Sequence, residues 1–526
     1  MNTLSMIIII GIYGLIILGL GYLGYCRTKN ASDYLIAGGK ANPFIMALAY
    51  GCTFISTSAI IGFGGAAALF GMGVLWLTFL TIFVGVFLAF VVFGKRTLIV
   101  GRELGVKTFP ELLGKRFSSK FIQKFAAAIV FVAMPIYAAA VMIGAVRFIE
   151  TTIDISYIWA VIIFAIVVAG YVMTGGLKGV FYTDAFQGSI MFLGMVALLF
   201  FTYDQLGGVA TAHQKLTQLS TMVPDSLQAK GHQGWTMMPS FGSEYWWTLV
   251  STIILGVGIG VLAQPQLVVR FLTVKGPKEL NRGVIVGGIF ILVMTGVAFV
   301  VGALTNIYFA DTVGKISLLA SIDPASGNPN IDTIIPMYIN SAMPPWFSYI
   351  FMLTLLSAAM STLSGQFHVI GSSLSYDIYQ KQDLTISRCG ILAALIITVY
   401  LTLKLPVSII AVATSVFFGI CAAAFLPVYF AALFWPRATK SGAISSMVSG
   451  FAVSMLLMLF VHQKEANALG LSQAIFGKTT LLSFPWTVVD PILISLPVSA
   501  LTLVVVSLLT QPANVLVPKS IKAVNK

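Results

Sequence analysis

The stretch Ala47–Gly65 reads ALAYGCTFISTSAIIGFGG and lies inside an apolar run from about Asn42 to Phe70. An α-helix rises about 1.5 Å per residue and the hydrocarbon core of a bilayer is about 30 Å thick, so one span needs ~20 residues. This run is longer than that and is most polar in its middle, where four hydroxyl side chains occur: Thr53, Ser56, Thr57 and Ser58. We therefore predict a membrane helix that is interrupted partway across the bilayer, and such helices commonly form binding sites.

The composition places the chain among all-α polytopic membrane proteins. Hydrophobic residues make up 58% of the chain and charged residues 9%, and the mean hydropathy is +0.97, whereas soluble domains carry about 25% charged residues. The net charge of +13 is typical of basic cytoplasmic loops and does not indicate a nucleic-acid partner. The four cysteines form no close pair and the four histidines show no ligand spacing, so we expect no disulfide framework and no transition-metal site. The sequence also offers no nucleophile–base pair, so we do not expect an enzyme.

The apolar runs predict thirteen membrane spans, at residues 5–25, 42–70, 72–94, 123–148, 155–173, 184–203, 245–272, 283–309, 345–376, 387–405, 406–435, 440–462 and 488–511. The tenth and eleventh runs meet near Leu405–Pro406, and one continuous helix there would reduce the count to twelve. With the N-terminus outside, all but seven of the 30 Lys and Arg residues fall in inside loops; the exceptions are Arg147, Lys215, Lys230, Lys315, Lys404, Lys464 and Lys478. Because cytoplasmic loops carry the basic excess, we expect an N-out, C-in topology.

A second interrupted run, Leu249–Arg270, contains GVGIGVLAQP. The two interrupted runs are the second and seventh spans, so each opens a set of five spans, and the two sets cross the membrane in opposite senses. Paired interrupted helices in inverted halves mark the central site of many transporters, although glycines also permit plain close packing. We expect one transporter domain, made of a first helix at 5–25, a repeat at 42–203, an inverted repeat at 245–435, two peripheral helices at 440–511 and a cytoplasmic tail at 512–526.

Two long loops are expected outside, Thr202–Glu244 and Asp311–Pro345. Long loops on a transporter are either lids or simple covering structure. We interpret the first loop as covering structure and leave both interpretations open for the second.

The ninth span carries a row of hydroxyl side chains. Thr354, Ser357, Ser361 and Ser364 recur at steps of three and four residues, so they share one helix face, and Thr362 flanks them. A small hard cation such as sodium prefers oxygen ligands, which these hydroxyls and the freed carbonyls of an unwound helix would supply. The alternative is that each hydroxyl bonds the carbonyl four residues earlier or a neighbouring helix.

Few charged side chains fall near the spans. Asp184 stands at the start of the sixth span and is either a helix cap or a cation ligand near the inner exit. We interpret Arg147 and Glu150 at the outer end of the fourth span, and Arg270 at the inner end of the seventh, as interfacial anchors or surface pairs. His368 on the ninth span is interpreted as a hydrogen-bonded core residue, with a proton relay as the alternative. No Arg or Lys is expected at mid-membrane depth.

Three segments resemble the solute:sodium symporter family: DYLIAGGK after the first helix, TGGLKGVFYTDAFQ before the sixth span, and SAAMSTLSGQ, which is followed by Ser372, Ser373 and DIY. The best-known members carry proline, galactose, pantothenate, monocarboxylates or sialic acid. The resemblance implies a leucine-transporter-type core of two inverted five-helix repeats, with one helix before it and two after it.

The resemblance also implies residue roles. The sodium ligands would be the carbonyls of Cys52, Ile55 and Ala358 and the hydroxyls of Ser361 and Thr362, and Asp184 would belong to a possible second cation site. The solute would lie near Ser56, Thr57 and Ser58, with Tyr137 and the seventh-span glycines as walls. Val257 and Val261 align with an aromatic pair of proline carriers, which weakens an assignment to proline.

These observations predict a sodium-coupled symporter that works by alternating access in a prokaryotic cell membrane, with sodium, the lipid bilayer and a small organic solute as its partners. We favour a carboxylate-bearing solute, such as an amino acid, a monocarboxylate or a pantothenate-like acid. A neutral solute such as a sugar or polyol, proton coupling and a membrane sensor are the alternatives. The oligomeric state is open, and a monomer fits.

Overall fold

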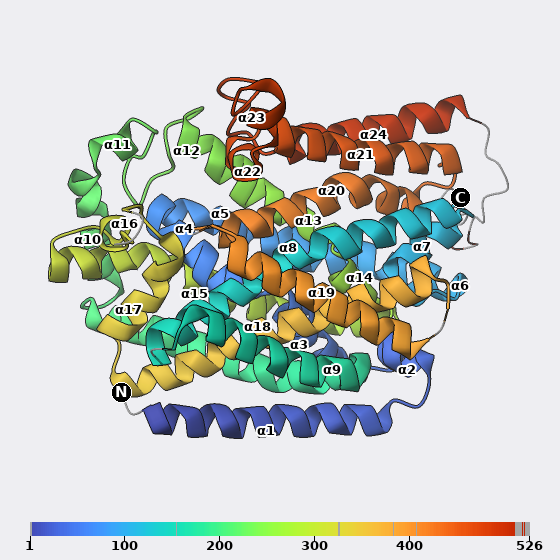
Figure 1. Ribbon diagram of the computed structural model, residues 1–526, viewed down its shortest axis with the longest axis horizontal. Coiled ribbons are helices and arrows are strands. Elements are labelled where there is room, and N and C mark those ends of the chain that lie inside the picture. The colour runs from blue at the N-terminus through green and yellow to red at the C-terminus, as the bar shows by residue number, and fades with distance from the viewer. Residues whose placement is uncertain are drawn as a thin grey trace.

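The computed structural model describes residues 3–153, 155–323, 327–381, 383–406, 408–510, 518 and 520, and these residues are almost entirely helical (Figure 1). Their only β-type pairing is two isolated bridges, Ala41 with Val274 and Ile322 with Pro329. The expected tail at 512–526 lies outside the described residues except for Pro518 and Ser520.

The first half of the chain forms nine α-helices and three joined π- or 3₁₀-segments that matter for the site. They are α1 (Thr3–Arg27), α2 (Ala31–Ile36), α3 (Pro43–Phe54), η2 (Ser58–Gly62), α4 (Phe63–Phe70), η3 (Gly71–Val74), α5 (Leu75–Ile82), η4 (Phe83–Gly94), α6 (Lys95–Glu103), α7 (Phe109–Arg116), α8 (Lys120–Ile153) and α9 (Tyr157–Gln205).

The second half continues with the helices of the expected inverted repeat and the two that follow it. They are α12 (Glu244–Trp247), η6 (Thr248–Gly256), α13 (Val257–Gly260), η7 (Val261–Ala263), α14 (Pro265–Phe271), α15 (Pro277–Val313), α18 (Pro345–Ser372), η9 (Ser373–Ile378), α19 (Leu384–Lys404), α20 (Ile410–Phe434), α21 (Lys440–Phe460) and α24 (Ile492–Leu509). Short helices fill the loops: α10 (Val209–Gln218), α11 (Asp225–Gln228), α16 (Ser317–Ala320), α17 (Ile334–Ala342), α22 (Gln463–Leu469) and α23 (Leu471–Phe476).

Eleven described helical stretches are long and apolar enough to cross a membrane, and two shorter apolar helices, Pro43–Phe54 and Tyr157–Met173, accompany them. α9 bends at Gly176, whose φ of 57° suits glycine and where an added Cβ would lie 2.6 Å from the Tyr34 ring. α19 ends at Lys404 and α20 begins at Ile410, so the runs that meet near Leu405–Pro406 are separate helices. The exact number of crossings and their orientation stay predictions.

Both interruptions expected from the sequence are present. α3 ends at Phe54 because Ile55 adopts extended geometry (φ −87°, ψ 102°), and helical structure resumes at η2. In the second half, Gln264 is extended (ψ 114°) between η7 and α14. Each break leaves helix-end carbonyls and amides that need partners inside the bundle.

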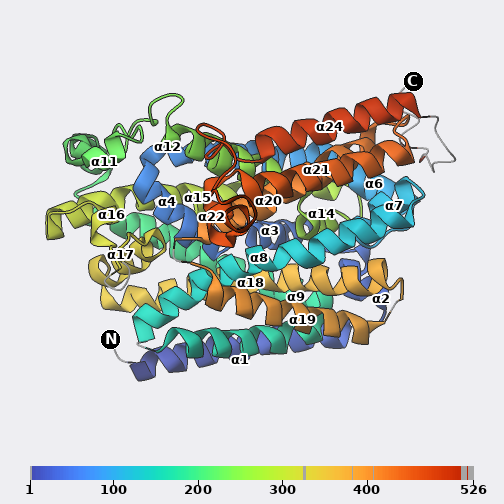
Figure 2. The same cartoon turned by 45° about the horizontal axis from the view of Figure 1, so that its top comes forward.

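The broken helix α3–α4 lies at the centre of the bundle. α3 packs against α9, α15 and α18, and α4 packs against α15. In both views α1 and α24 lie on opposite sides of the bundle (Figures 1 and 2).

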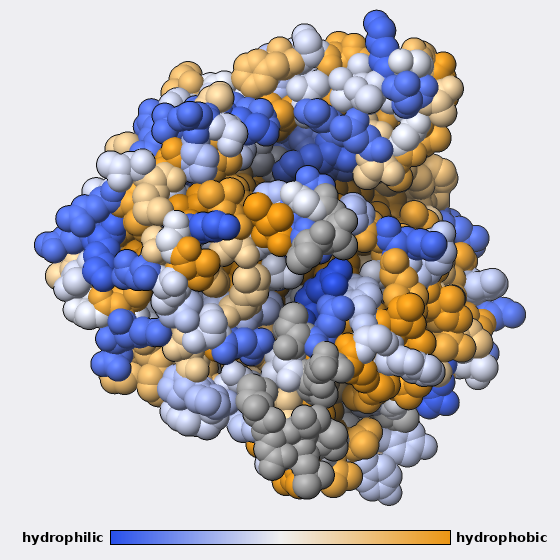
Figure 3. Space-filling model, turned by 60° about the vertical axis from the view of Figure 1, so that its left-hand side comes forward, coloured by the Kyte–Doolittle hydropathy of each residue, from blue (hydrophilic) through white to orange (hydrophobic). Residues whose placement is uncertain are grey.

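The two ends of the bundle differ in character. One, called the basic end here, holds α2, α6 and α7, and the other, the loop end, holds α10, α11, α16 and α17 (Figure 1). The surface on the side of the loop end mixes hydrophilic and hydrophobic residues (Figure 3).

Glycines allow α4 and α15 to approach closely. A Cβ added at Gly302 of α15 would lie 2.1 Å from the Gly64 carbonyl oxygen, whereas one added at Gly296 of the same helix meets nothing within 4 Å. The backbone contact therefore depends on glycine at position 302.

We expect Gly302→Ala to lower the melting temperature, because relieving such an overlap typically costs about 1–3 kcal/mol. Gly296→Ala is the matched control and should be neutral or stabilising by up to about 1 kcal/mol, since alanine is the better helix former. Thermal unfolding of both variants in detergent checks this, and equal melting temperatures would contradict the packing described for Gly302.

Candidate functional site

Two hydroxyls of α18 meet the free end of α3. Ser361 Oγ donates to the Cys52 carbonyl at 3.1 Å and also lies 3.2 Å from the Ala358 carbonyl, and Thr362 Oγ1 donates to the Cys52 carbonyl at 3.2 Å. All four residues are fully buried. Four oxygens thus converge with no sulfur or imidazole among them, which is the donor type that a small hard cation prefers.

Ile55 stands at the break itself. It is 1% exposed, and its amide donates to the Gly51 carbonyl at 2.7 Å. The hydrogen bonds that Ser361 and Thr362 of α18 donate go to the carbonyl of Cys52, three residues before Ile55. Hydrogen-bond contacts therefore link four of the expected sodium ligands, Cys52, Ala358, Ser361 and Thr362. Ile55 lies next to them along the chain but shares none of these contacts.

A buried ion pair lies beside this group. Asp184 Oδ2 is 3.2 Å from Arg270 Nη2, both side chains are fully buried, and the same nitrogen bonds Thr53 Oγ1. Cys52 Sγ donates to the Asp184 carbonyl at 3.4 Å. Asp184 Oδ1 finds no hydrogen-bond partner among the described residues.

This pair corrects two sequence interpretations. Asp184 is no helix cap, because it lies inside α9, eight residues after the Gly176 bend. Arg270 is no interfacial anchor, because α14 continues past the break at Gln264 and carries it inward against the end of α3. A cationic side chain therefore lies buried inside the bundle beside the end of α3.

A cavity of about 20 Å³ lies on the other side of the break. Three expected solute residues line it, Ser56, Tyr137 and Val257, and Tyr137 Oη donates to Ser56 Oγ at 3.3 Å. The remaining lining residues include four phenylalanines and three threonines that the sequence did not single out: Phe54, Phe63, Phe299, Phe418, Thr81, Thr295 and Thr414. The space suffices for about one water molecule, so this conformation is closed around the site.

The other three expected solute residues do not line this cavity. Thr57 Oγ1 donates to the Val141 carbonyl at 2.5 Å, and Val261 lies against Gly85, where an added Cβ would be 3.2 Å from a Val261 methyl group. The Ser58 hydroxyl is buried without a hydrogen-bond partner among the described residues. None of the three is among the residues that line the cavity.

The other ionisable residues named in the sequence analysis, His368, Arg147 and Glu150, each contact a nearby group. His368 Nε2 bonds the Tyr34 carbonyl at 3.0 Å, which ties α18 to α2. Arg147 and Glu150 form a partly exposed ion pair at 2.9 Å.

Comparison with known proteins identifies the family. The model of the sodium:solute symporter family matches residues 34–450. The chain belongs to this family. It is 29% identical over 474 residues to a sodium/pantothenate symporter of Haemophilus influenzae, covering 86% of this chain and 90% of that one. It is 26% identical over 470 residues to a sodium/proline symporter of Staphylococcus aureus, covering 86% of each.

A solved structure shares the fold of this symporter. It is a Na⁺-coupled sialic acid symporter in a substrate-bound outward-open state, with a TM-score of 0.74 and 19% identity over 97% of this chain and 99% of that one. The expected leucine-transporter-type fold is thereby confirmed. The protein is a multi-pass membrane protein and a sodium-coupled symporter for a small organic solute, and its relatives are transporters rather than enzymes.

The first long loop of the symporter holds the far end of the broken helix. The Ala68 carbonyl at the end of α4 accepts a hydrogen bond from Trp235 Nε1 of this loop at 2.8 Å. It also accepts one from Asn306 Nδ2 of α15 at 2.8 Å. The Met72 amide donates to the Trp235 carbonyl at 2.7 Å. The loop therefore satisfies helix-end groups that would otherwise lack partners.

His232 completes this contact. Its Nε2 lies 2.7 Å from the Leu69 carbonyl and its Nδ1 accepts from the Gly234 amide at 3.1 Å. A carbonyl only accepts and an amide N–H only donates, so both bonds require the neutral ring with its proton on Nε2. Protonation of Nδ1 would break the bond to Gly234.

We expect Arg270→Met to destabilise the symporter strongly, by about 3–5 kcal/mol, because it leaves the Asp184 charge buried without a partner. The double variant Arg270→Met, Asp184→Leu should recover most of that loss, since neither charge remains. Lys215→Met is the control, because its ion pair with Asp311 is exposed to solvent. Thermal unfolding in detergent measures all three, and a native-like melting temperature for Arg270→Met would contradict the buried pair.

We expect acid to loosen the loop at His232. Burial lowers the pKa of His232, although its hydrogen bond to Leu69 acts in the other direction. Because the open loop then binds the proton more tightly than the closed loop, closure is complete above the usual histidine value of about 6.5 and weakens as the pH falls below it. Hydrogen exchange of residues 232–243, corrected for intrinsic rates, should rise on acidification.

The control for this experiment is His232→Gln, whose amide donates without titrating over that range. Its loop should exchange at a rate that does not depend on pH after the same correction. Equal pH dependence in the native protein and in the variant would refute the role of His232.

Proposed function

We propose that this symporter uses an inward sodium gradient to import a small organic solute that carries a carboxylate. The observation that carries the proposal is the convergence of Ser361 and Thr362 on the Cys52 carbonyl, where α3 breaks. With sodium bound, the carbonyls of Cys52, Ile55 and Ala358 and the two hydroxyls would form its shell. None of these ligands is a carboxylate, so the ion is held without a deep electrostatic trap.

Sodium and solute would bind cooperatively. Sodium joins α3 to α18, and the cavity beside Ser56 and Tyr137 lies immediately after the same break. Each ligand therefore orders backbone that the other needs, which makes their binding mutually favourable. Each sodium moved across 100 mV contributes about 2.3 kcal/mol to accumulation of the solute.

Three observations support a carboxylate-bearing solute. Helical structure resumes at η2, so the N-terminal end of that segment faces the break and favours negative charge. The cavity adds hydroxyls from Ser56, Thr81 and Thr295. The two relatives are named for pantothenate and proline, both of which carry a carboxylate. A neutral polyol is the second candidate, because no lining residue of the cavity is cationic.

We also propose which end of the bundle faces the cytoplasm. α2, α6 and α7 lie at the basic end, together with the segments that carry Arg27, Lys40 and Lys178 (Figure 1). The excess of basic residues favours the cytoplasm for this end. The N-terminus would then lie outside and the protein in the cell membrane of a prokaryote. A second cation beside Asp184 requires Arg270 to move first, since its guanidinium holds Oδ2.

Uptake into proteoliposomes tests the proposal. Labelled pantothenate, proline and galactose are offered with an inward gradient of sodium, of potassium or of protons. We expect accumulation of a carboxylate-bearing solute in the sodium arm alone. Accumulation that a proton gradient drives equally well without sodium would refute sodium coupling, and uptake of galactose alone would favour the neutral candidate.

We expect the double variant Ser361→Ala, Thr362→Ala to need at least roughly tenfold more sodium for half-maximal uptake, the effect of losing about 1.4 kcal/mol of binding free energy. Ser372→Ala is the matched control, because its hydroxyl on the same helix donates only to the Val369 carbonyl at 3.0 Å. Unchanged sodium dependence in the double variant would move the sodium site elsewhere.

A further inference from the structure

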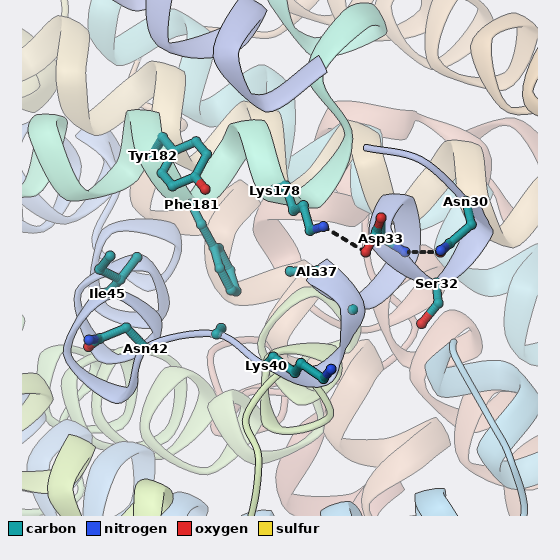
Figure 4. A pocket seen from close by; sticks show the side chains of 12 residues that line it. Asn30, Ser32, Asp33, Ala37, Lys40, Asn42, Ile45, Lys178, Phe181 and Tyr182 are labelled. Carbon is teal, nitrogen blue, oxygen red and sulfur yellow. Dashed lines mark hydrogen bonds and ion pairs between the residues drawn. The ribbon is translucent and has the colours of Figure 1, made fainter. Parts of the chain in front are cut away.

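Two cavities outside the candidate site differ sharply in character. One, of about 550 Å³, opens at the basic end and is polar, with the ion pair of Asp33 and Lys178 in its wall (Figure 4). The other, of about 220 Å³, lies where residues 461–491 join α21 to α24. Apart from His462, every residue that lines this second cavity is apolar. The two cavities therefore suit different occupants.

The apolar cavity is suited to a hydrocarbon chain. Leu482 and Trp486 line it and are 47% and 46% exposed, so it opens to the molecular surface. An apolar cavity of about 150 Å³ already stays free of water and binds benzene. His462 adds little polarity, because its Nδ1 is paired with the Glu465 carboxylate.

The segment around this cavity, called the α21–α24 loop here (residues 461–491), is also apolar on its outer surface. Large apolar side chains that are between 52% and 61% exposed recur along it, among them Leu469, Ile475, Phe476 and Phe484. An apolar surface of this kind marks a contact with a membrane or with another protein. The loop carries four charged residues: Lys464, Glu465, Lys478 and the buried Asp490.

The α21–α24 loop lies at the depth of the bilayer. α21 has 21 residues and α24 has 18, whereas α8 has 34 and α15 has 37. In Figures 1 and 2, which share their horizontal axis, α22 and α23 lie level with α1, whereas α11 lies beyond the N-terminal end of α1. Because α1 is itself long and apolar enough to cross a membrane, a loop at its level is surrounded by lipid.

The backbone of the loop is prepared for that position. Backbone groups in lipid need hydrogen-bond partners within the protein. The Gln463 amide donates to the Thr487 carbonyl at 2.9 Å, and the Leu481 amide donates to the Phe460 carbonyl at 2.8 Å. These two bonds join distant parts of the loop to each other and to α21, and the helices α22 and α23 pair much of the backbone between them.

We propose that the α21–α24 loop is embedded in the leaflet nearer the loop end, and that its cavity holds an acyl chain of a phospholipid. A lipid is the occupant that the surroundings select, because the loop joins two membrane helices whose exposed side chains are apolar as well, such as Leu456 and Val505. Lys478 follows Phe476 by two residues, and its long side chain can reach the headgroup phosphates from there.

An acyl chain in this cavity would also support the core. Val489 and Pro491 line the cavity on either side of Asp490, whose amide donates to Ser251 Oγ of η6 at 3.0 Å. Asp490 Oδ1 accepts from the Ile492 amide at 2.9 Å and so caps α24. η6 is the first part of the interrupted seventh span, so the lipid holds the start of α24 against a helix of the central bundle.

Spin labels measure the depth of the loop in proteoliposomes of phosphatidylethanolamine and phosphatidylglycerol. In the full chain with both exposed cysteines removed (Cys26→Ser, Cys389→Ser), a nitroxide is attached at Phe476→Cys. The references are Val505→Cys on α24, where the side chain is 50% exposed, and Phe241→Cys between α11 and α12, where it is 87% exposed. We expect oxygen to relax the labels at 476 and 505 more than a water-soluble nickel chelate does, and the reverse at 241.

Nickel access at 476 equal to that at 241 would place the loop in water and overturn the proposal. Poor access of both reagents would mean that protein, such as a second copy of this chain, covers the loop, which would overturn it too. If Phe476→Cys fails to fold, Ile475→Cys gives the same test, since Ile475 is 61% exposed beside it.

Native mass spectrometry of delipidated protein titrated with phosphatidylglycerol tests the cavity. We expect Ile494→Trp, which fills the cavity, to weaken retention of the lipid by roughly tenfold. Val505→Trp is the matched control, because it adds the same ring at an exposed position of the same helix, and it should bind as the native protein does. Leu482→Trp replaces Ile494→Trp if that variant fails to fold. Equal retention in the cavity variant and the control, or none in the native protein, would overturn the assignment of the cavity.

Discussion

The structure depends on how the free end of α3 is satisfied. A helix that stops inside a bilayer leaves carbonyl groups without partners, and hydrocarbon offers none. Here the Cys52 carbonyl receives two hydroxyl hydrogen bonds from α18, and Arg270 bonds the Thr53 hydroxyl next to it. The break is stable because other helices complete it, and the Cys52 carbonyl that they complete is the one proposed to bind sodium.

The two halves of the broken helix are held by different means, which suits a transporter whose two ends must open in turn. At the loop end, α4 is fastened by neutral hydrogen bonds from Trp235, Asn306 and His232. At the break, the end of α3 meets a buried ion pair, and ion pairs of this kind cost solvation that their attraction only partly repays. A charged pair therefore contacts α3, whereas neutral hydrogen bonds to backbone carbonyls hold α4.

Much of this could be predicted from the sequence, because apolar runs and misplaced hydroxyls are local signals. The interruption near Ile55 follows from four hydroxyls in the middle of an apolar run, and the hydroxyl row that contains Ser361 follows from helical periodicity. The pairing of Ser361 and Thr362 with the Cys52 carbonyl came from the family resemblance. The burial of Arg270 could not be predicted, because it depends on how α14 is aimed after the break at Gln264. Which of the expected solute residues line the cavity could not be predicted either, since the geometry of the break decides which side chains face it.

The central claim is that sodium joins the end of α3 to α18. Hydrogen exchange in sodium and in potassium at equal ionic strength measures this directly. We expect sodium to slow exchange of the backbone amides at residues 52–59 and 358–362, while the amides of α21 and α24 remain unaffected. Equal exchange in the two salts, or protection spread evenly over the whole chain, would contradict it.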